Sequence, residues 1–291
     1  MKYLPILFTV FILFFGVVSC TAPIDLKTND SEPVIVIYGC LNEQMTYQTI
    51  KISGSSPYFE EKQNPLVSDA VVTIESSENE LFELKERSYE KGIYQTTVPM
   101  AAVAGVTYRL KVVVDFDKDG VLETYEAMTT MPRLFELDSI GIDSLSIMGY
   151  KHYALNLFGQ EEAGEDYYLC RITLNDTIER FKLSEYIAFS DVGFDDSYID
   201  KVALMYIDDI SNDVVDEEDG YLLVQSGDKI TLYTSRIEKT YYDFIWQCQQ
   251  ERTGENPFFG GPASNITTNI SNGGVGYFTS FYTSVQEAYV P

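Results

Sequence analysis

The sequence predicts a mainly β protein, with a β-sandwich of immunoglobulin or transthyretin type followed by a second β-rich domain that contains one helix. Beyond residue 33, short β-branched and aromatic runs alternate with polar residues at period two, which is typical of half-buried strands. A hydrophobic fraction of 45%, with 17 Phe and 22 Tyr residues, is enough for sizeable cores. One later segment has helical spacing instead.

The first nineteen residues have the pattern of a cleavable signal peptide. Lys2 precedes an apolar run over residues 3–18 that is too short to span a bilayer comfortably. Val-Val-Ser at 17–19 then precedes Cys20, as in the lipobox that bacterial lipoprotein signal peptidase recognises. We expect cleavage before Cys20 and attachment through lipid on its thiol, at about 0.8 kcal/mol per buried CH₂. An ordinary secretory signal and an uncleaved anchor are the alternatives.

A lipidated cysteine and polar tether are expected over residues 20–33, and the β-sandwich over residues 34–132. Turn residues separate the predicted strands, as in sandwich folds. In the clearest strand, Tyr108, Leu110 and Val112 share one face, while the intervening residues are basic. The predicted strands are 34–41, 47–53, 69–75, 81–85, 92–98, 108–114 and 124–128.

The second domain is expected over residues 133–291. Ser235 and Glu238 have the spacing of a capping box, in which both side chains bind free amides at a helix start. Apolar residues then recur at helical spacing, so we predict a helix near 236–252 with one face packed on a sheet. The predicted strands of this domain are 139–147, 152–158, 167–174, 202–207, 221–224, 229–233 and 276–283.

Charge excludes some partners. The chain has 45 acidic and 20 basic residues, a net charge of −25, and such a surface repels the phosphates of nucleic acid. Acidic clusters at 161–166 and 208–219 are interpreted as solvated surface. Cys40, Cys170 and Cys248 are far apart and His152 is the single histidine, which argues against zinc. The sequence leaves open whether two of these cysteines form a disulfide.

One segment has the spacing of a twelve-residue calcium loop. The flanking residues have strand character, so an EF-hand sensor is not expected, and a solvated hairpin turn is the alternative. Three carboxylates at alternate positions would repel one another without a cation, which favours a structural Ca²⁺. The candidate ligands are Asp115, Asp117, Asp119, the Val121 carbonyl, Glu123 (directly or through water) and Glu126.

Aromatic residues are also frequent near the C-terminus. Phe258, Phe259, Tyr277 and Phe278 could form a binding platform for a sugar ring or a partner protein. The alternative is that these side chains fill the core of the second domain.

Several short motifs occur in a recognisable order. After the lipobox come Val-Ile-Val-Ile-Tyr-Gly at 34–39, Ser-Asp-Ala-Val-Val-Thr-Ile at 68–74, Gly-Ile-Tyr at 92–94 and Gly-Val-Thr-Tyr-Arg-Leu at 105–110. Later come Tyr-Asp-Phe at 242–244, Asn-Pro-Phe at 256–258, Asn-Ile at 265–266 and 269–270, and Gly-Gly-Val-Gly-Tyr-Phe at 273–278. With these motifs the chain resembles the domain-of-unknown-function-4249 lipoproteins of Bacteroidota-type bacteria over nearly its whole mature length.

The resemblance implies an outer-membrane lipoprotein, facing the cell surface or the periplasm, that is often paired with a TonB-dependent nutrient transporter. It implies no catalytic residues. The first domain also resembles the carboxypeptidase regulatory-like sandwich, a module associated with scaffolding rather than chemistry.

The leading functional hypothesis is therefore a non-enzymatic lipoprotein that acts as an accessory or ligand-binding partner of such a transporter. The alternatives are an envelope-associated hydrolase acting on glycans or peptides, and a purely structural envelope protein. His152 could serve as a general base, but no GxSxG nucleophile motif accompanies it. With 45 acidic residues, paired carboxylates for glycoside hydrolysis can be nominated anywhere and carry no signal.

Overall fold

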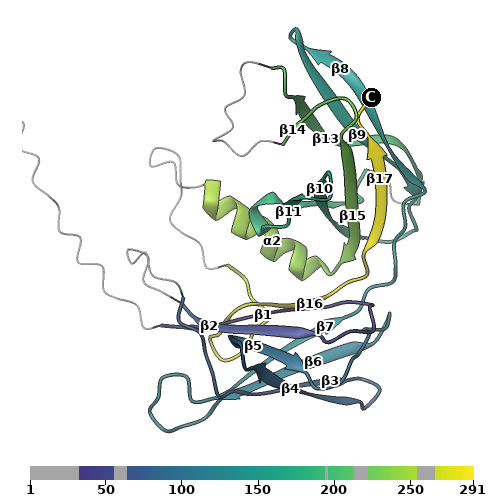
Figure 1. Cartoon of the computed structure of the whole chain (residues 1–291). Coiled ribbons are helices and arrows are strands. Elements are labelled where there is room, and N and C mark those ends of the chain that lie inside the picture. The colour runs from purple at the N-terminus through teal and green to yellow at the C-terminus, as the bar shows by residue number, and fades with distance from the viewer. Residues whose placement is uncertain (1–32, 56–63, 194–195, 213–221, 254–265) are drawn as a thin grey trace, which may run out of the picture. The chain divides into compact units, whose positions relative to one another are not determined.

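The computed structural model describes residues 33–55, 64–193, 196–212, 222–253 and 266–291 (Figure 1). Strands dominate these segments and one long helix accompanies them, so the predicted mainly β class is confirmed. The predicted signal peptide, Cys20 and the tether up to residue 32 lie outside the described residues, as do Phe258 and Phe259. None of the helices in the described part of the chain is long and apolar enough to cross a membrane.

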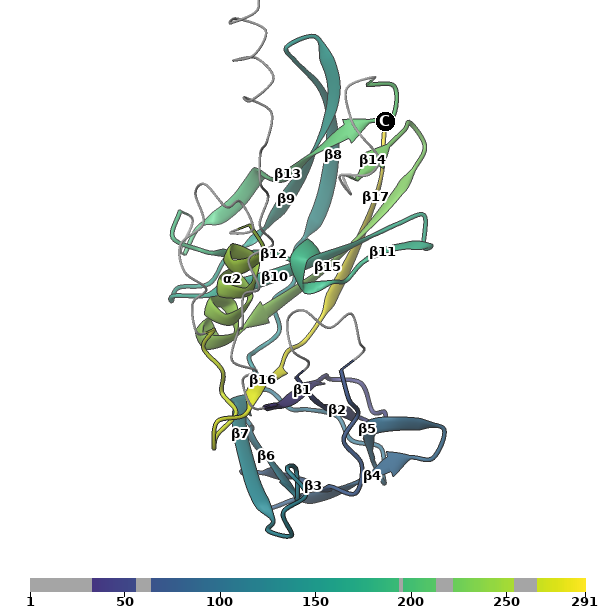
Figure 2. The same cartoon turned by 90° about the vertical axis from the view of Figure 1, so that its left-hand side faces the viewer.

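The first sheet has eight strands in the order β16-β1-β2-β5-β4-β3-β6-β7 (Figures 1 and 2). The seven strands predicted before residue 132 are all present, and the C-terminal part of the chain adds the eighth. Their bounds are β1 Ile35–Leu41, β2 Thr49–Gly54, β3 Val71–Ser76, β4 Leu81–Arg87, β5 Glu90–Thr96, β6 Thr107–Val114, β7 Glu123–Thr130 and β16 Val275–Ser280.

This sheet curls around a core of its own. Buried and less buried positions alternate along β1 and β6, as the period-two pattern predicts. The buried faces bring together Ile35, Ile37 and Val112 with side chains from the other strands. The two ends of the sheet approach each other where Ser271 exchanges two hydrogen bonds with Glu126. The result is a sandwich-like or barrel-like arrangement with one continuous core.

Strand β16 crosses the predicted domain boundary. It pairs in parallel with β1, with Gly276 opposite Ile37 and Phe278 opposite Gly39. A side chain at Gly276 would lie 2.1 Å from the Ile37 carbonyl oxygen, so the close approach of the two strands requires glycine there. Residues 33–291 group as a single unit by their contacts. The division into two domains at residue 132 stays a prediction. Because β16 belongs to the first sheet, that boundary would not separate the two sheet systems completely.

The second region contains two further sheets. A five-stranded sheet has the order β11-β10-β15-β17, with β12 also paired to β10, and a four-stranded sheet has the order β14-β13-β9-β8. The bounds are β8 Ser139–Ile147, β9 Tyr150–Gln160, β10 Tyr167–Leu174, β11 Ile178–Arg180, β12 Ile187–Ser190, β13 Tyr198–Asp209, β14 Leu223–Val224, β15 Lys229–Ile237 and β17 Ser284–Tyr289. The strand predicted over 276–283 is not a single strand. It covers most of β16, in the first sheet, and the residues that lead into β17, in the five-stranded sheet.

The predicted capping box is wrong. Ser235 and Ile237 lie at the end of β15, and helix α2 begins only at Lys239 and runs to Thr253. The Glu238 carboxylate instead accepts hydrogen bonds from the Thr129 hydroxyl at 2.8 Å and the Thr130 amide at 3.1 Å. Local spacing assigned the Glu238 side chain to helix capping, but this side chain makes a tertiary contact with β7 instead. The predicted apolar face of the helix does pack on the sheet, through Tyr241, Phe244 and Ile245.

Candidate functional site

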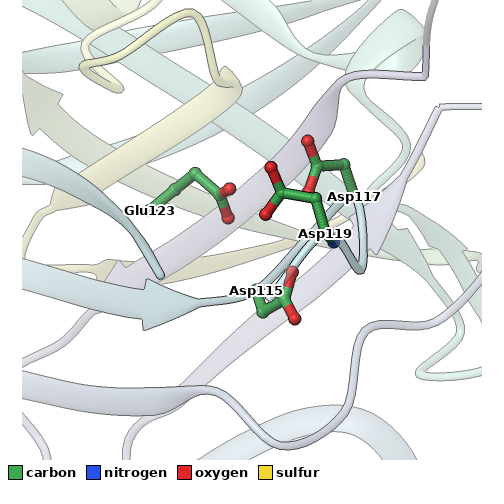
Figure 3. Close-up of side chains that lie close together, drawn as sticks. All are labelled: Asp115, Asp117, Asp119 and Glu123. Carbon is green, nitrogen blue, oxygen red and sulfur yellow. The ribbon is translucent and has the colours of Figure 1, made fainter. Parts of the chain in front are cut away.

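The predicted calcium loop is a hairpin between β6 and β7. Figure 3 shows three aspartates on the loop, with Glu123 at the start of β7 pointing toward them. One oxygen from each of Asp115, Asp117, Asp119 and Glu123 lies within 4.8 Å of the others. The hairpin therefore gathers four of the carboxylates that the sequence nominated.

The side chains of this hairpin also hold its backbone. Asp115 accepts a hydrogen bond from the Gly120 amide at 3.2 Å, and Asp119 accepts one from the Val121 amide at 2.7 Å. Glu123 accepts one from the Phe116 amide at 2.8 Å. These contacts preform the loop, and each uses a single carboxylate oxygen.

Glu126 is not part of the cluster, which corrects the expectation taken from the twelve-residue spacing. It lies three residues further along β7, where it faces Lys111 in the β6 register and its amide donates to Ser271. EF-hand spacing brings its last glutamate back to the ion because a helix follows the loop. A strand follows here, so Glu123 takes that place. The Val121 carbonyl stays a predicted ligand.

The donor set of the hairpin suits a hard divalent cation. The second oxygen of Asp115, Oδ1, is buried and has no hydrogen-bond partner among the described residues. Carboxylate oxygens are the ligands that Ca²⁺ prefers, and an unpaired buried oxygen is costly without a donor or an ion. The exposed loop also matches the alternative of a solvated turn, so calcium binding stays a proposal.

The acidic cluster at 161–166 is only partly the solvated surface that the sequence predicted, because Glu162 and Glu165 are exposed but Glu161 is not. Glu161 is fully buried, and its carboxylate accepts hydrogen bonds from the Tyr168 hydroxyl at 2.7 Å and the Asp196 amide at 3.1 Å. Buried Arg236 lies 3.1 Å from Asp166, and burial is the main cause of a raised Asp166 pKa. These charges hold β10, β15 and the adjoining loops together. Spacing failed here because the pairing arginine lies some 70 residues away.

His152, the candidate general base, pairs with an aspartate, and the three described cysteines are unpaired. His152 Nδ1 lies 2.7 Å from Asp208 Oδ1, across the β9–β13 pair. In the described part of the chain Cys40, Cys170 and Cys248 are free thiols. Burial raises the pKa of the Cys40 and Cys170 thiols to about 12, so both stay protonated at neutral pH.

Tyr277 and Phe278, the two described residues of the predicted aromatic platform, are packed rather than displayed. Tyr277 is 1% exposed and Phe278 is fully buried, so these two side chains do not form a binding platform. Tyr277 contacts Tyr241 and Phe244 of α2, while Phe278 belongs to the core of the first sheet. Phe258 and Phe259 lie outside the described residues.

A pocket of about 390 Å³ lies where the first sheet meets the five-stranded sheet. Residues at even positions of β1, such as Tyr38 and Cys40, face away from the core of the first sheet. Arg171 lies at an odd position of β10, directly opposite Tyr233 of β15. The pocket is lined by Tyr38, Cys40, Asn42, Glu43, Gln44, Arg171, Phe181, Tyr186, Tyr233, Phe281, Thr283 and Val285.

Aromatic rings surround the Arg171 guanidinium. Its central carbon lies 5.1 Å from the ring centre of Phe181, 5.3 Å from that of Phe281 and 6.0 Å from that of Tyr233. One terminal nitrogen donates to the Thr283 hydroxyl at 3.2 Å, while Nε is buried without a partner among the described residues. Each cation–π contact stabilises the charge by about 0.5–2 kcal/mol, less than a carboxylate partner would contribute once desolvated.

Glu43 supplies the opposite charge. Its Oε2 atom is buried and has no hydrogen-bond donor among the described residues. Burial raises the pKa of Tyr38, Tyr186 and Cys40 above their ordinary values, so these three groups of the wall stay neutral at pH 7. Arg171 and Glu43 are therefore the charged groups of an otherwise neutral, aromatic pocket.

The sequence contained one signal for this pocket. Arg171 is the only charged residue in an otherwise apolar or uncharged strand that is buried on both faces over Tyr167–Leu174. A charge in the middle of such a strand needs a partner or a site. The other lining residues come from four separate segments, which no local pattern could bring together.

These features define a class of protein: a mainly β chain with a curled N-terminal sheet, a second pair of sheets and a charged aromatic pocket between them. The chain belongs to the family Domain of unknown function (DUF4249), whose model matches residues 21–287. The family to which the sequence motifs pointed is thereby confirmed. No curated protein matches the chain.

Proposed function

We propose that this protein is a non-enzymatic lipoprotein of the outer membrane, anchored through Cys20, that binds a small ligand as the accessory partner of a TonB-dependent nutrient transporter. The observation that carries the proposal is the pocket of about 390 Å³ with Arg171 and Glu43 in its wall. Its volume lies within the range of small-molecule sites, about 300–1,000 Å³. Its lining combines five aromatic side chains with polar and charged groups that could orient a ligand.

The membrane anchor is supported by the leader. Val-Val-Ser at 17–19 precedes Cys20, and the family match begins directly after it, at residue 21. Acyl chains on Cys20 would hold the protein at a membrane surface at about 0.8 kcal/mol per buried CH₂. A ligand-binding body tethered in this way would deliver its cargo to a membrane-embedded transporter at high local concentration.

A structural Ca²⁺ at the β6–β7 hairpin is the second part of the proposal. Asp115, Asp117, Asp119 and Glu123 would supply the carboxylate ligands. The cation would offset the repulsion among four negative charges and fix the hairpin at the far end of the strands that carry the first core. It would have no part in chemistry.

The test is a mild-detergent extraction of the native acylated protein, followed by mass spectrometry of what co-purifies. The proposal predicts an identified TonB-dependent transporter with the wild-type chain, and its loss together with membrane association in Cys20→Ala. As a control, Arg87→Met, a surface change in the first sheet, should retain both. Recovery of the acylated chain alone would contradict the transporter partnership.

A further inference from the structure

We infer that the Arg171 pocket takes a small zwitterion: a free α-amino acid or a very short peptide, with its carboxylate at Arg171, its ammonium at Glu43 and an apolar or aromatic side chain against the surrounding rings. This inference rests on the proposed function, because it assumes that the pocket holds a ligand. It adds the chemical class of that ligand.

Arg171 has no carboxylate partner among the described residues. Arg87, Arg133, Arg180 and Arg236 each lie within ion-pair distance of a carboxylate. Among the described residues no carboxylate lies within that distance of Arg171, in a chain with 45 acidic residues. A guanidinium presents a planar fork of donors that matches a carboxylate. We infer that a ligand supplies that carboxylate.

Glu43 likewise has no partner for its buried carboxylate oxygen among the described residues. Glu43 and Arg171 line the same pocket but form no ion pair with each other, and Glu43 Oε2 is buried without a donor. A simple anion would meet repulsion from Glu43, and a simple cation would meet repulsion from Arg171. A neutral sugar would leave both charges unpaired. A zwitterion is the class that pairs both at once.

Aromatic rings form the apolar part of the pocket wall. Phe181, Tyr233 and Phe281 surround the guanidinium and offer ring faces and edges to an apolar side chain. At about 390 Å³ the pocket lies near the lower end of the range for small-molecule sites. This size suits an amino acid or dipeptide and leaves little room for a longer peptide or an oligosaccharide.

The test compares three probes on the full acylated chain in detergent by isothermal titration calorimetry. L-phenylalanine carries both charges, L-phenylalaninamide lacks the carboxylate, and N-acetyl-L-phenylalanine lacks the ammonium. We expect L-phenylalanine to bind at least tenfold more tightly than either derivative. A thermal-melt screen with each of the twenty amino acids identifies a better side chain if one exists, and the same pair of derivatives is then made from it.

Variants assign each charge to its residue. Arg171→Met should reduce affinity for L-phenylalanine at least tenfold but should not reduce affinity for the amide, because it removes the repulsion between Arg171 and the ammonium of that probe. Glu43→Gln should reduce affinity for L-phenylalanine at least tenfold but should not reduce affinity for the N-acetyl acid, because it removes the repulsion between Glu43 and the carboxylate of that probe. Arg87→Met, whose guanidinium pairs with Glu90 in the first sheet, is the matched control and should bind like the wild type.

The outcomes separate the ligand class from the proposed function. Equal binding of the N-acetyl acid and the free amino acid would overturn the zwitterion and leave a ligand-binding pocket. No response to any amino acid in either assay would also overturn the inference, whereas co-purification of the transporter tests the proposed function independently. The three probes discriminate between ligand classes in the wild-type protein alone. The inference can therefore be overturned even if a variant fails to fold.

Discussion

Replacing Gly276 by alanine tests the joint that places β16, and hence the pocket wall that follows it, against the first sheet. Gly276 has φ +103°, and an added Cβ would lie 2.1 Å from the Ile37 carbonyl oxygen and 2.9 Å from its carbon. The strain of a side chain at such a backbone angle costs about 1–3 kcal/mol. Relief of the clash must also move β16 away from β1, which weakens hydrogen bonds worth about 0.5–1.5 kcal/mol each.

We therefore expect Gly276→Ala to lower the free energy of unfolding by about 3–5 kcal/mol. At about 2–4 °C per kcal/mol for a chain of this size, the melting temperature should fall by about 6–20 °C. The control is Gly273→Ala, three residues earlier, where φ is +74° but no atom lies within 4 Å of the added Cβ. That variant should lose only about 1–2 kcal/mol.

The assay is guanidinium denaturation followed by the fluorescence of Trp246, the single tryptophan, together with a thermal melt. Phe281 and Thr283 follow β16 directly, so Gly276→Ala should also weaken ligand binding at the pocket, and Gly273→Ala should not. Equal losses of stability in the two variants would refute the close approach of β16 and β1.

Two further predictions concern charged groups. Tyr153 is fully buried and donates to Asp209 at 2.8 Å, and hydrogen bonds, led by those from Ser211, hold the Asp209 pKa well below its usual range; Tyr153→Phe should cost about 1.5–3 kcal/mol at pH 7. A depressed carboxyl pKa gives stability that is present above the unfolded value near about 3.9 and is lost as pH falls through the folded value, so urea denaturation should show the cost of Tyr153→Phe shrinking at low pH, and a constant cost would contradict the contact. For the hairpin, Ca²⁺ at about a hundred times its dissociation constant should stabilise the chain by roughly 2.7 kcal/mol in thermal melts. Glu123→Gln should abolish that shift and Glu126→Gln should preserve it, whereas an unchanged wild-type melt in calcium and in chelator would end the proposal.

The β architecture was predictable because apolar and polar residues alternate locally along the strands. The patterns at 139–147 and 167–174 give the bounds of β8 and β10, and those of the first domain give all of its consecutive strands to within a few residues. Burial of one face per strand forces this pattern on the sequence, so the sequence reveals it.

The misses arose where long-range contacts decide the structure. Glu238 has the spacing of a helix cap but binds Thr129 and Thr130 of β7. Glu161 has the composition of a surface residue but is buried beside Tyr168. The short strands β11 and β12 owe their pairing to β10 rather than to a pattern of their own.

The candidate sites divide in the same way. The acidic hairpin is contiguous, so the sequence named Asp115, Asp117, Asp119 and Glu123, and only the strand geometry after the loop removed Glu126. The pocket is assembled from β1, β10, β15 and segments near β11 and β17. No spacing rule joins Glu43 to Arg171, 128 residues apart, although Arg171 alone could have been singled out.

The most direct test of a lipid-anchored, ligand-binding role is native mass spectrometry of the protein after gentle extraction from its own membrane. We expect a chain that begins at Cys20, carries acyl chains on that residue and retains a small bound molecule that is absent from Arg171→Met. A chain with its leader intact and no lipid, or the same bound mass in wild type and Arg171→Met, would contradict it.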